Sequence, residues 1–178
     1  MNPSSHRRAF AEPVIARVAM GLGDDARGRP APSGGPDGDA RAAQLWRSLT
    51  AASPIGIFEG DLDGHIGWAN TRLTQIWGVP MSKVAGRGWI DGVHPDDAPG
   101  RLAGWRRASA EGREYELEFR VVRPEGELRW VHGRSAVVWD EAGRAIGTVG
   151  TVEDVTERRV AEQAARALAA EREATLGQ

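Results

Sequence analysis

The sequence predicts an α+β domain in which helices cover one face of an antiparallel sheet. Three observations predict this class. Short runs of alternating apolar and polar residues flank turn signals, which is typical of β-hairpins. Between two such groups, residues 71–112 carry apolar side chains at three- and four-residue spacing, which is typical of short helices. The length of 178 residues is enough for one core with flanking segments.

The N-terminal flank divides into a tail and a helix. Residues 1–40 are expected to be a disordered tail, because they are rich in Gly, Pro, Asp and Ser and bury too little surface to offset the entropy of ordering. An amphipathic helix is expected over 41–53, with Asp39 as its N-cap. Pro54 ends this helix, because proline lacks the amide donor that a helix needs. The apolar face consists of Ala42, Leu45, Trp46, Leu49 and Ala52.

The domain itself is expected over 54–155, and it opens with two strands joined by Asp63-Gly64. This pair predicts a two-residue type I′ turn, which needs a positive φ at both positions. Asn70 is expected to cap the helix that follows, and Gly78 is expected to end it. That helix carries Leu73, Ile76 and Trp77 at helical spacing.

The second half of the domain is expected to contain one helix and three strands. The helix is predicted over 98–110, a long hairpin over 115–139 and a last strand over 146–155. Gly147 and Gly150 lie inside the last strand. Glycine at such positions indicates a bulge or a close approach by another element.

A long C-terminal helix is expected over 156–178. Asp154 fits the first position of a D-x-x-E capping box, and Thr156 is an alternative cap. One side of the helix is lined by Val160, Ala164, Ala167, Ala170 and Ala174, with Leu168 beside them. Alanine lets a second helix approach closely but buries little area, so this seam predicts at most a weak coiled coil.

The composition excludes several classes of protein. The net charge is only -2, and basic residues are interleaved with acidic ones, so neither nucleic acid nor a membrane surface is an expected partner. No run approaches the ~18 apolar residues of a membrane span. The chain has no cysteine, which excludes disulfides, thiolate zinc sites and iron–sulfur clusters. A cytoplasmic location is expected.

Several segments, in this order, resemble a PAS domain of the branch that carries an HPDD-like motif. The segment "SPIGIFEGDLDGHIGWAN" resembles the opening strand pair, with the family's asparagine at Asn70. "HPDD" at 94–97 resembles the start of the long helix, and "DVTER" at 154–158 resembles the exit of the PAC motif. The resemblance implies a five-stranded antiparallel sheet, with the first hairpin as its two central strands. It also implies a ligand cavity between the sheet and the helices.

The residues that the resemblance places at the cavity are Trp77, Trp89, Trp130, His132 and Asn70. Each has a structural alternative. The Asn70 side chain is well suited to tie strand to helix through local backbone hydrogen bonds. Tryptophans at these spacings also fit a plain hydrophobic core, and His132 also fits a structural role in its strand.

The residues limit which cofactors are expected. A haem ligand would require a histidine within 98–110, which has none, so haem is not expected. Flavin relatives that form a photoadduct use a cysteine, so that chemistry is excluded. Non-covalent flavin binding stays open, because it requires only an apolar slot, a stacking surface and a few polar contacts.

Neither a metal site nor an enzyme is expected. No two histidines stand at the i, i+4 spacing of a helical metal site. "DLDG" at 61–64 resembles the start of a calcium loop but lacks the later ligands. No nucleophile, base and orienting acid are recognisable as a catalytic set.

The resemblance therefore implies a sensory and dimerisation module of bacterial-type signal transduction. The state of the cavity, set by a small ligand or a redox cofactor, would reach the C-terminal helix through a junction at Asp154 and Thr156. The expected partners are a second copy of the chain, through the flanking helices, and a signalling partner or output domain. The alternative is a ligand-free protein–protein interaction module whose cavity is filled by its own side chains.

Overall fold

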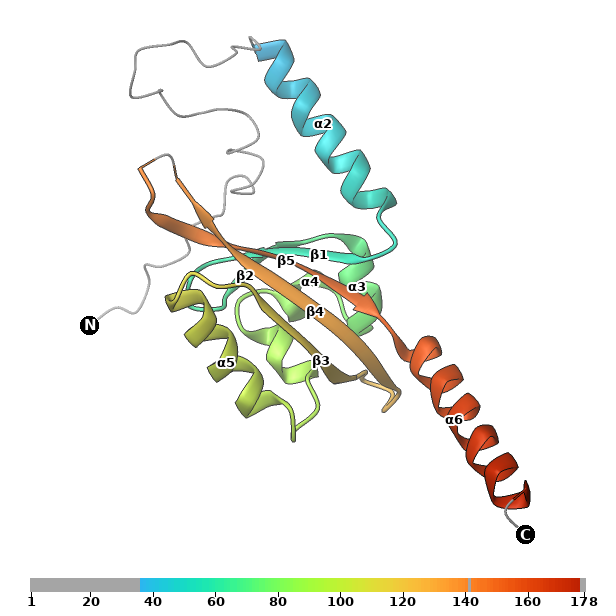
Figure 1. Cartoon of the computed structure of the whole chain (residues 1–178). Helices are drawn as coiled ribbons and strands as arrows, with labels where there is room; N and C mark the ends of the chain where they lie inside the picture. The colour runs from blue at the N-terminus through green and yellow to red at the C-terminus, as the bar shows by residue number, and fades with distance from the viewer. Residues whose placement is uncertain (1–35, 141, 177–178) are drawn as a thin grey trace.

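The computed structural model describes residues 36–140 and 142–176, and it confirms the predicted α+β class. One five-stranded antiparallel sheet is covered on one face by short helices (Figure 1). The elements are α2 Pro36–Ala52, β1 Gly56–Gly60, β2 Ile66–Ala69, α3 Thr71–Trp77, α4 Met81–Val84, the 3-10 helix η1 Gly88–Gly92, α5 Ala98–Ala110, β3 Tyr115–Val122, β4 Leu128–Trp139, β5 Ala145–Asp154 and α6 Thr156–Leu176.

The strand order is β2-β1-β5-β4-β3. The expectation that the first hairpin supplies the two central strands is therefore wrong: β2 lies at an edge and β5 is central. β5 is antiparallel to both of its neighbours, with Gly150 opposite Phe58 of β1 on one side and opposite Ser135 of β4 on the other. The last strand thus joins the two hairpins into one sheet, and it ends directly before α6.

The connection between β1 and β2 also differs from the prediction. It is a loop over 61–65 and not a two-residue type I′ turn, because Gly64 has a positive φ of 88° and Asp63 does not. The Asp61 carboxylate accepts hydrogen bonds from the amides of Asp63 and His65, each at 2.9 Å. These bonds close a wider loop than the Asp-Gly pair suggests.

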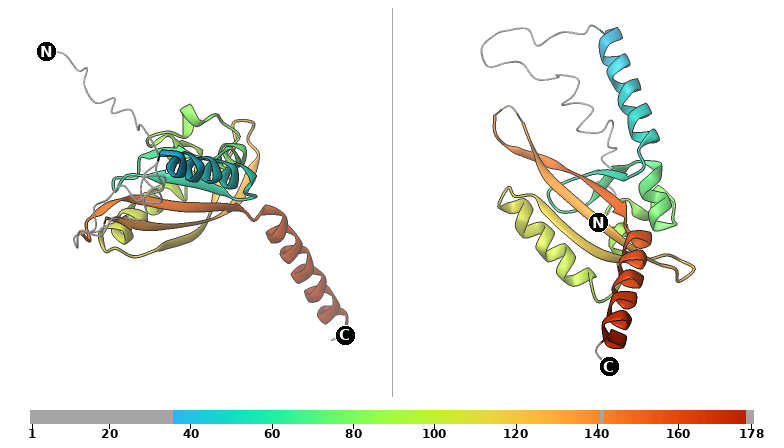
Figure 2. Two further views of the ribbon diagram at one scale, coloured as in Figure 1. Left: turned by 90° about the horizontal axis from the view of Figure 1, so that it is seen from above. Right: turned by 45° about the vertical axis from the view of Figure 1, so that its right-hand side comes forward.

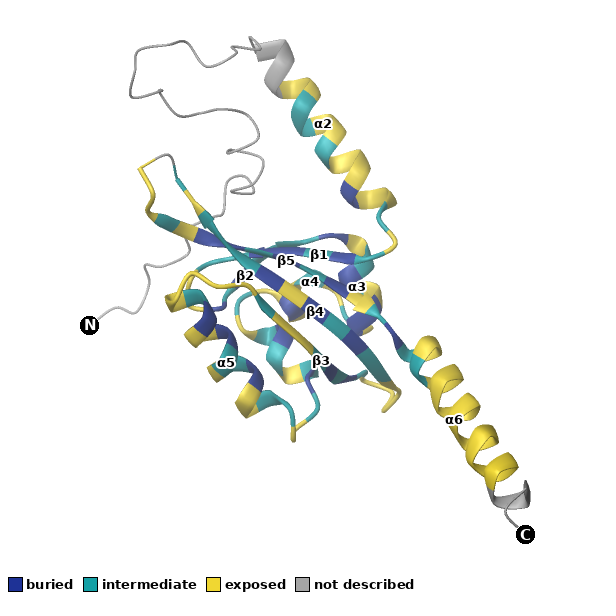
Figure 3. Ribbon diagram, in the orientation of Figure 1, coloured by how far each residue is buried: buried dark blue, intermediate teal, exposed yellow. Residues whose placement is uncertain are grey.

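The core lies between the inner face of the sheet and helices α3, α4, η1 and α5 (Figure 3). Its largest fully buried apolar side chains are Phe119, Leu73, Ile76, Val84, Val121, Val131 and Val152. Gly150 allows the ring of Phe58 to lie against β5, since a Cβ there would stand 2.4 Å from Phe58 Cζ. The glycine predicted to mark a close approach in the last strand does so.

The N-terminal helix begins earlier than expected. α2 starts at Pro36, a residue that is favourable in the first turn because it has no amide to leave unpaired. Residues 36–40, expected in the tail, are therefore helical, and the rest of that expected tail, 1–35, lies outside the described residues. The predicted apolar face is largely uncovered: Leu45 and Leu49 are 59% and 60% exposed.

The C-terminal helix α6 extends away from the sheet (Figure 2). Val160 and Leu168 of the predicted seam are exposed, as are Ala164, Ala167 and Ala170. The side chain of Ala174, also predicted in the seam, lies outside the described residues. Among the described helices, none is long and apolar enough to cross a membrane.

Candidate functional site

A cavity lies between the inner face of the sheet and the helices that cover it. It is lined by Phe58, Gly60, Gly64, Ile66, Leu73, Trp77, Trp89, Arg101, Trp105, Phe119, Thr148 and Val152. The space open to the centre of a water molecule is about 20 Å³, which is enough for one or two waters. The walls are apolar except for a guanidinium and a hydroxyl group.

Two of the predicted tryptophans line this cavity. Trp77 comes from α3 and Trp89 from η1, and both are buried. The indole N–H of Trp77 donates to the carbonyl of Trp89, and that of Trp89 donates to the carbonyl of Gly64, each at 2.9 Å. Because both polar groups are satisfied within the protein, these rings are held in place and present apolar surface to the cavity.

The β1–β2 loop closes one side of the cavity. Gly64 lies against the indole of Trp105 on α5, where a Cβ would stand 3.0 Å from Cζ3. Glycine is required here for two reasons, the positive φ and this close approach. The hairpin and the helices are therefore packed together around the cavity.

Arg101 is the cavity residue that the sequence interpretation missed. It lies on α5, is only 4% exposed and is one of the residues that line the cavity. Its Cζ lies 4.0 Å from the ring centroid of Phe119, 5.3 Å from that of Tyr115 and 5.9 Å from that of Trp89. A signal was present in the sequence, because Arg101 shares an apolar helix face with Trp105 and Ala108 at i+4 and i+7.

The charge of Arg101 is incompletely compensated. Its Nε and Nη1 are buried and have no hydrogen-bond partner within the described part of the chain. Burial lowers the pKa of Arg101 to about 10, although the Tyr115 hydroxyl opposes this change, so the group stays cationic at neutral pH. A buried unpaired charge costs on the order of several kcal/mol, and desolvated cation–π contacts recover only about 2 kcal/mol each.

Asn70 is not among the residues that line the cavity. Its side chain instead ties strand to helix through backbone hydrogen bonds, which was the alternative to ligand contact. Its Oδ1 accepts the amides of Ile57 at 2.9 Å and Leu73 at 3.1 Å. Its Nδ2 donates to the carbonyls of Thr50 at 2.9 Å and Ile55 at 3.0 Å. One buried side chain thus caps α3, as predicted, and also ties it to β1 and to the end of α2.

Trp130 and His132 lie on the outer face of the sheet, so the expectation that they face the cavity is wrong. Alternate residues of a strand point to opposite faces, and in β4 the inner positions are Val131 and Gly133. His132 Nε2 lies 2.7 Å from Glu116 of the neighbouring strand. The alternation of residues along β4 does not show which of its two faces is inward, since both faces of this sheet carry large side chains.

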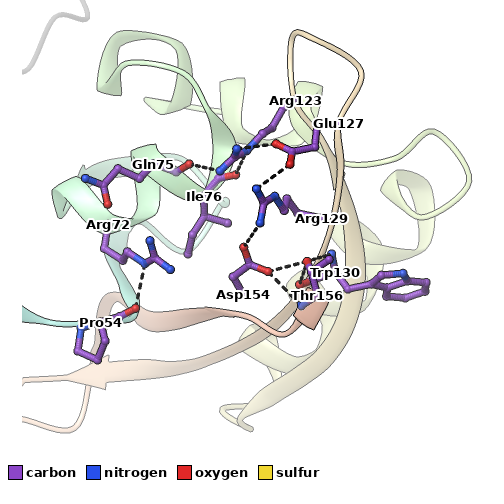
Figure 4. Close-up of polar contacts among 10 residues, drawn as sticks. All are labelled: Pro54, Arg72, Gln75, Ile76, Arg123, Glu127, Arg129, Trp130, Asp154 and Thr156. Carbon is purple, nitrogen blue, oxygen red and sulfur yellow. Dashed lines mark hydrogen bonds and ion pairs between the residues drawn. The ribbon is translucent and has the colours of Figure 1, made fainter. Parts of the chain in front are cut away.

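The predicted junction residues meet where β5 passes into α6 (Figure 4). Asp154 Oδ1 accepts the amide of Thr156 at 3.0 Å and its hydroxyl at 2.6 Å. Thr156 Oγ1 in turn accepts the amide of Trp130 on β4 at 2.9 Å. The Asp154 carboxylate thus accepts from the residue two positions later, as in an Asx turn. In a capping box it would instead accept from the amide of Glu157.

A chain of polar contacts leads from this junction to α3 (Figure 4). Asp154 Oδ2 accepts from Arg129 at 3.2 Å, and Arg129 donates to Glu127 at 2.7 Å. Glu127 also accepts from Arg123 at 2.6 Å. Arg123 then donates to the carbonyls of Gln75 at 2.6 Å and Ile76 at 3.1 Å in α3, the helix that carries Trp77 of the cavity wall.

Three potential metal ligands also approach one another in the β1–β2 loop. Donor atoms of Asp61, Asp63 and His65 lie within 4.8 Å of one another. Burial raises the pKa of Asp61, but hydrogen bonds from His65 and Asp63 outweigh it, and the pKa is lowered overall. Its carboxylate already accepts two amides and lies 2.7 Å from the His65 ring, so these groups shape the loop.

The cavity does not fit a flavin. An isoalloxazine ring is far larger than the one or two waters for which the cavity has room, and the indole N–H groups of Trp77 and Trp89 already donate to backbone carbonyls.

Comparisons with known proteins agree with this architecture. A family model described as PAS fold matches residues 66–152. An uncharacterized protein, y4lL, of Sinorhizobium fredii is 32% identical over 113 residues, which cover 64% of this chain and 14% of that protein. The methyl sulfide methyltransferase-associated sensor of Methanosarcina acetivorans is 29% identical over 139 residues, covering 66% of this chain and 14% of the sensor. The chain therefore spans only a small part of the curated relatives it matches.

A solved structure shows the same fold. The PAS domain of a protein from Colwellia psychrerythraea superposes with a TM-score of 0.56 at 18% identity, covering 65% of this chain and 98% of that domain. The residues that the family model matches begin at β2 and include all the cavity helices and most of the three-stranded half of the sheet. The unit built around this cavity is therefore a PAS domain.

Proposed function

We propose that this PAS domain is a sensory signalling module that relays the state of its cavity to α6 through Asp154 and Thr156. The similarity to a sensor of Methanosarcina acetivorans supports the sensory role. The observation that carries the relay is the unbroken chain of polar contacts between the cavity wall and the start of α6. We assign the chain no catalytic step.

The relay begins at α3. Leu73 and Trp77 line the cavity from this helix, while the carbonyls of Gln75 and Ile76 in the same turns hold Arg123. A change in the cavity that moves α3 therefore also moves the acceptors of Arg123. A ligand can cause this change only if it binds one position of α3 more tightly than another.

The relay ends at α6, which carries exposed apolar side chains. Val160 and Leu168 are 60% and 51% exposed, and the alanines between them allow a second helix to approach closely. We assign this surface to a second copy of the chain or to a signalling partner or output domain. The exposed Leu45 and Leu49 of α2 extend the surface that a homodimer would use.

The relay can be tested without knowing the ligand. Trp77→Phe perturbs the cavity wall by removing the hydrogen bond to Trp89, and hydrogen exchange of amides 157–160 reports on the first turn of α6. We expect Trp77→Phe to speed this exchange in the wild-type background but not in an Asp154→Ala background. Glu153→Ala, an exposed neighbour on β5, is the matched control and should preserve the response.

An equal response to Trp77→Phe with and without the Asp154 carboxylate would show that the junction does not couple cavity and helix. Circular dichroism of each variant establishes that the domain is folded.

The second candidate is a ligand-free interaction module, which the small size of the cavity favours. An absorption spectrum and a native mass spectrum of the protein purified from cells separate the two. Extra mass on the protein indicates a bound ligand, whereas a bare dimer mass indicates the interaction module. A ligand that binds only the native state must also raise the unfolding temperature.

A further inference from the structure

We propose that the cavity binds a small organic anion, a short aliphatic monocarboxylate, and that Arg101 is its counter-ion. This inference rests on the proposed sensory function, since it names the class of ligand that the cavity would sense. It is carried by a cation that is buried in an apolar cavity and lacks partners for part of its guanidinium group.

The surroundings of Arg101 supply no carboxylate. The groups that face its guanidinium come from two elements, namely Trp89 of η1 and Tyr115 and Phe119 of β3. Within the described residues Arg101 takes part in no ion pair. Its Nε and Nη1 together carry three N–H groups, all buried and all without an acceptor.

The backbone of the sheet is shaped around this cation. Gly133 lies on the inner face of β4, where a Cβ would stand 2.9 Å from Arg101 Nη2 and 3.0 Å from Phe119 Cε1. Any other residue at this position would push the guanidinium away from the ring of Phe119. The absence of a side chain at Gly133 thus gives Arg101 a defined place in the cavity.

The other residues that line the cavity favour a ligand with one carboxylate group and a short alkyl chain. Apart from Arg101 and the indole N–H groups, the lining residues carry one polar side-chain group, the hydroxyl of Thr148, which donates to the carbonyl of Asp61 at 3.3 Å. Phosphate or sulfate needs donors around three or four oxygens, and this cavity offers one cation only. A carboxylate places both oxygens on the guanidinium, and a short alkyl chain contacts the aromatic and aliphatic walls.

The size of the cavity limits the alkyl chain of the ligand to a few carbons. There is room for one or two waters as the side chains stand, so a carboxylate of two to four carbons can enter only if side chains of the wall move slightly. Acetate, propionate and butyrate form a graded series that measures how far the walls can move. Trp77, Trp89 and Trp105 all line the cavity, so their fluorescence reports on occupancy directly.

The test is a titration with sodium propionate, followed by calorimetry and tryptophan fluorescence at constant ionic strength. Propionamide is the neutral probe of the same shape, and inorganic phosphate is the second anion. We expect propionate to bind the wild-type protein, propionamide and phosphate to bind at least about tenfold more weakly, and Arg101→Met to lose propionate binding by a similar factor.

Arg107→Met is the matched control, because it removes the same charge from an exposed position of the same helix. It should bind propionate as the wild type does. Arg101→Met is expected to keep or raise the unfolding temperature without ligand, because it replaces an uncompensated buried charge by an apolar side chain of similar size. A purely structural role for Arg101 would instead lower it.

Equal binding of propionamide and propionate, unchanged binding by Arg101→Met, tighter binding of phosphate, or no binding of any carboxylate would each overturn the proposal. Exchange of amides 157–160 in the same titration tests the relay separately. Propionate binding without a response of α6 would leave the ligand class standing and remove the relay.

Discussion

The guanidinium of Arg159 lies over the indole of Trp130, with its Cζ 3.9 Å from the ring centroid. The same guanidinium donates to Glu118 of β3 at 2.8 Å, and Arg158 donates to Glu118 at 2.8 Å. The first turn of α6 is therefore fixed to the outer face of two strands, while the rest of the helix is exposed. Trp130, expected in the cavity, instead contacts the first turn of α6.

Arg159→Gln should loosen this first turn while the domain stays folded. A cation–π contact at a partly exposed site contributes about 0.5–1 kcal/mol, and an exposed ion pair adds up to about 1 kcal/mol. We expect faster hydrogen exchange over 157–160, with little change in the exchange of β4. Arg166→Gln, farther along the exposed part of α6, should change neither, and equal effects of the two variants would contradict the anchoring role.

Asn70→Ala should be among the more destabilising single substitutions in the domain. It removes four hydrogen bonds at once and leaves the amides of Ile57 and Leu73 without their side-chain acceptor. Loss of the cap and unsatisfied buried groups together predict a loss of about 2–4 kcal/mol in unfolding free energy, measured by urea denaturation. Thr71→Ala, exposed at the next position, should cost well under half as much.

Two glycine-to-alanine substitutions should have opposite signs. At Gly150 a Cβ would stand 2.4 Å from Phe58 Cζ and 2.5 Å from the carbonyl oxygen of Arg134, so overpacking should cost about 1–3 kcal/mol or more. At Gly100 in α5 a Cβ meets nothing within 4 Å, and helix propensity predicts a gain of up to about 1 kcal/mol. Thermal unfolding of both variants checks the pair, and a neutral Gly150→Ala would contradict the packing described.

Asp97 should contribute stability that is lost in acid. Its carboxylate makes no side-chain cap at the N-terminus of α5 and instead accepts from Arg120 Nε at 3.0 Å and Nη2 at 2.7 Å. The hydrogen bond from the Arg120 side chain lowers the pKa of Asp97 below its usual 3.8. A lowered folded-state pKa means that the contribution is present above about pH 4 and disappears as the pH falls through the folded-state pKa.

The measurement is urea unfolding of the wild type and Asp97→Asn from pH 7 down to pH 2. The wild type should be more stable at pH 7, and the difference should shrink below pH 4. Asp91→Asn, an exposed carboxylate of η1, is the control for charge alone. A difference that stays constant across this range would exclude the Asp97–Arg120 pair as its source.

Much of the local structure followed from patterns that act over a few residues. Asn70 caps α3 and Gly78 ends it, as predicted, because a cap needs only a side-chain acceptor and a left-handed residue within one turn. The Asp63-Gly64 prediction failed for a comparable reason. The Asp61 carboxylate binds two amides of the loop and closes it more widely than the dipeptide alone would.

By itself the sequence determined the class of fold and the order of helices and strands, because spacing along a chain dictates which side chains share a face. The tryptophans of α3 and η1 were expected at the cavity from the resemblance to the PAS family and not from their spacing. Only the tertiary structure decided that β5 is central, that Trp130 and His132 face outward and that Arg101 lies buried among aromatic rings. These features depend on which strands pair and which helix lies over them. Such contacts join residues far apart in the chain, and no local pattern encodes them.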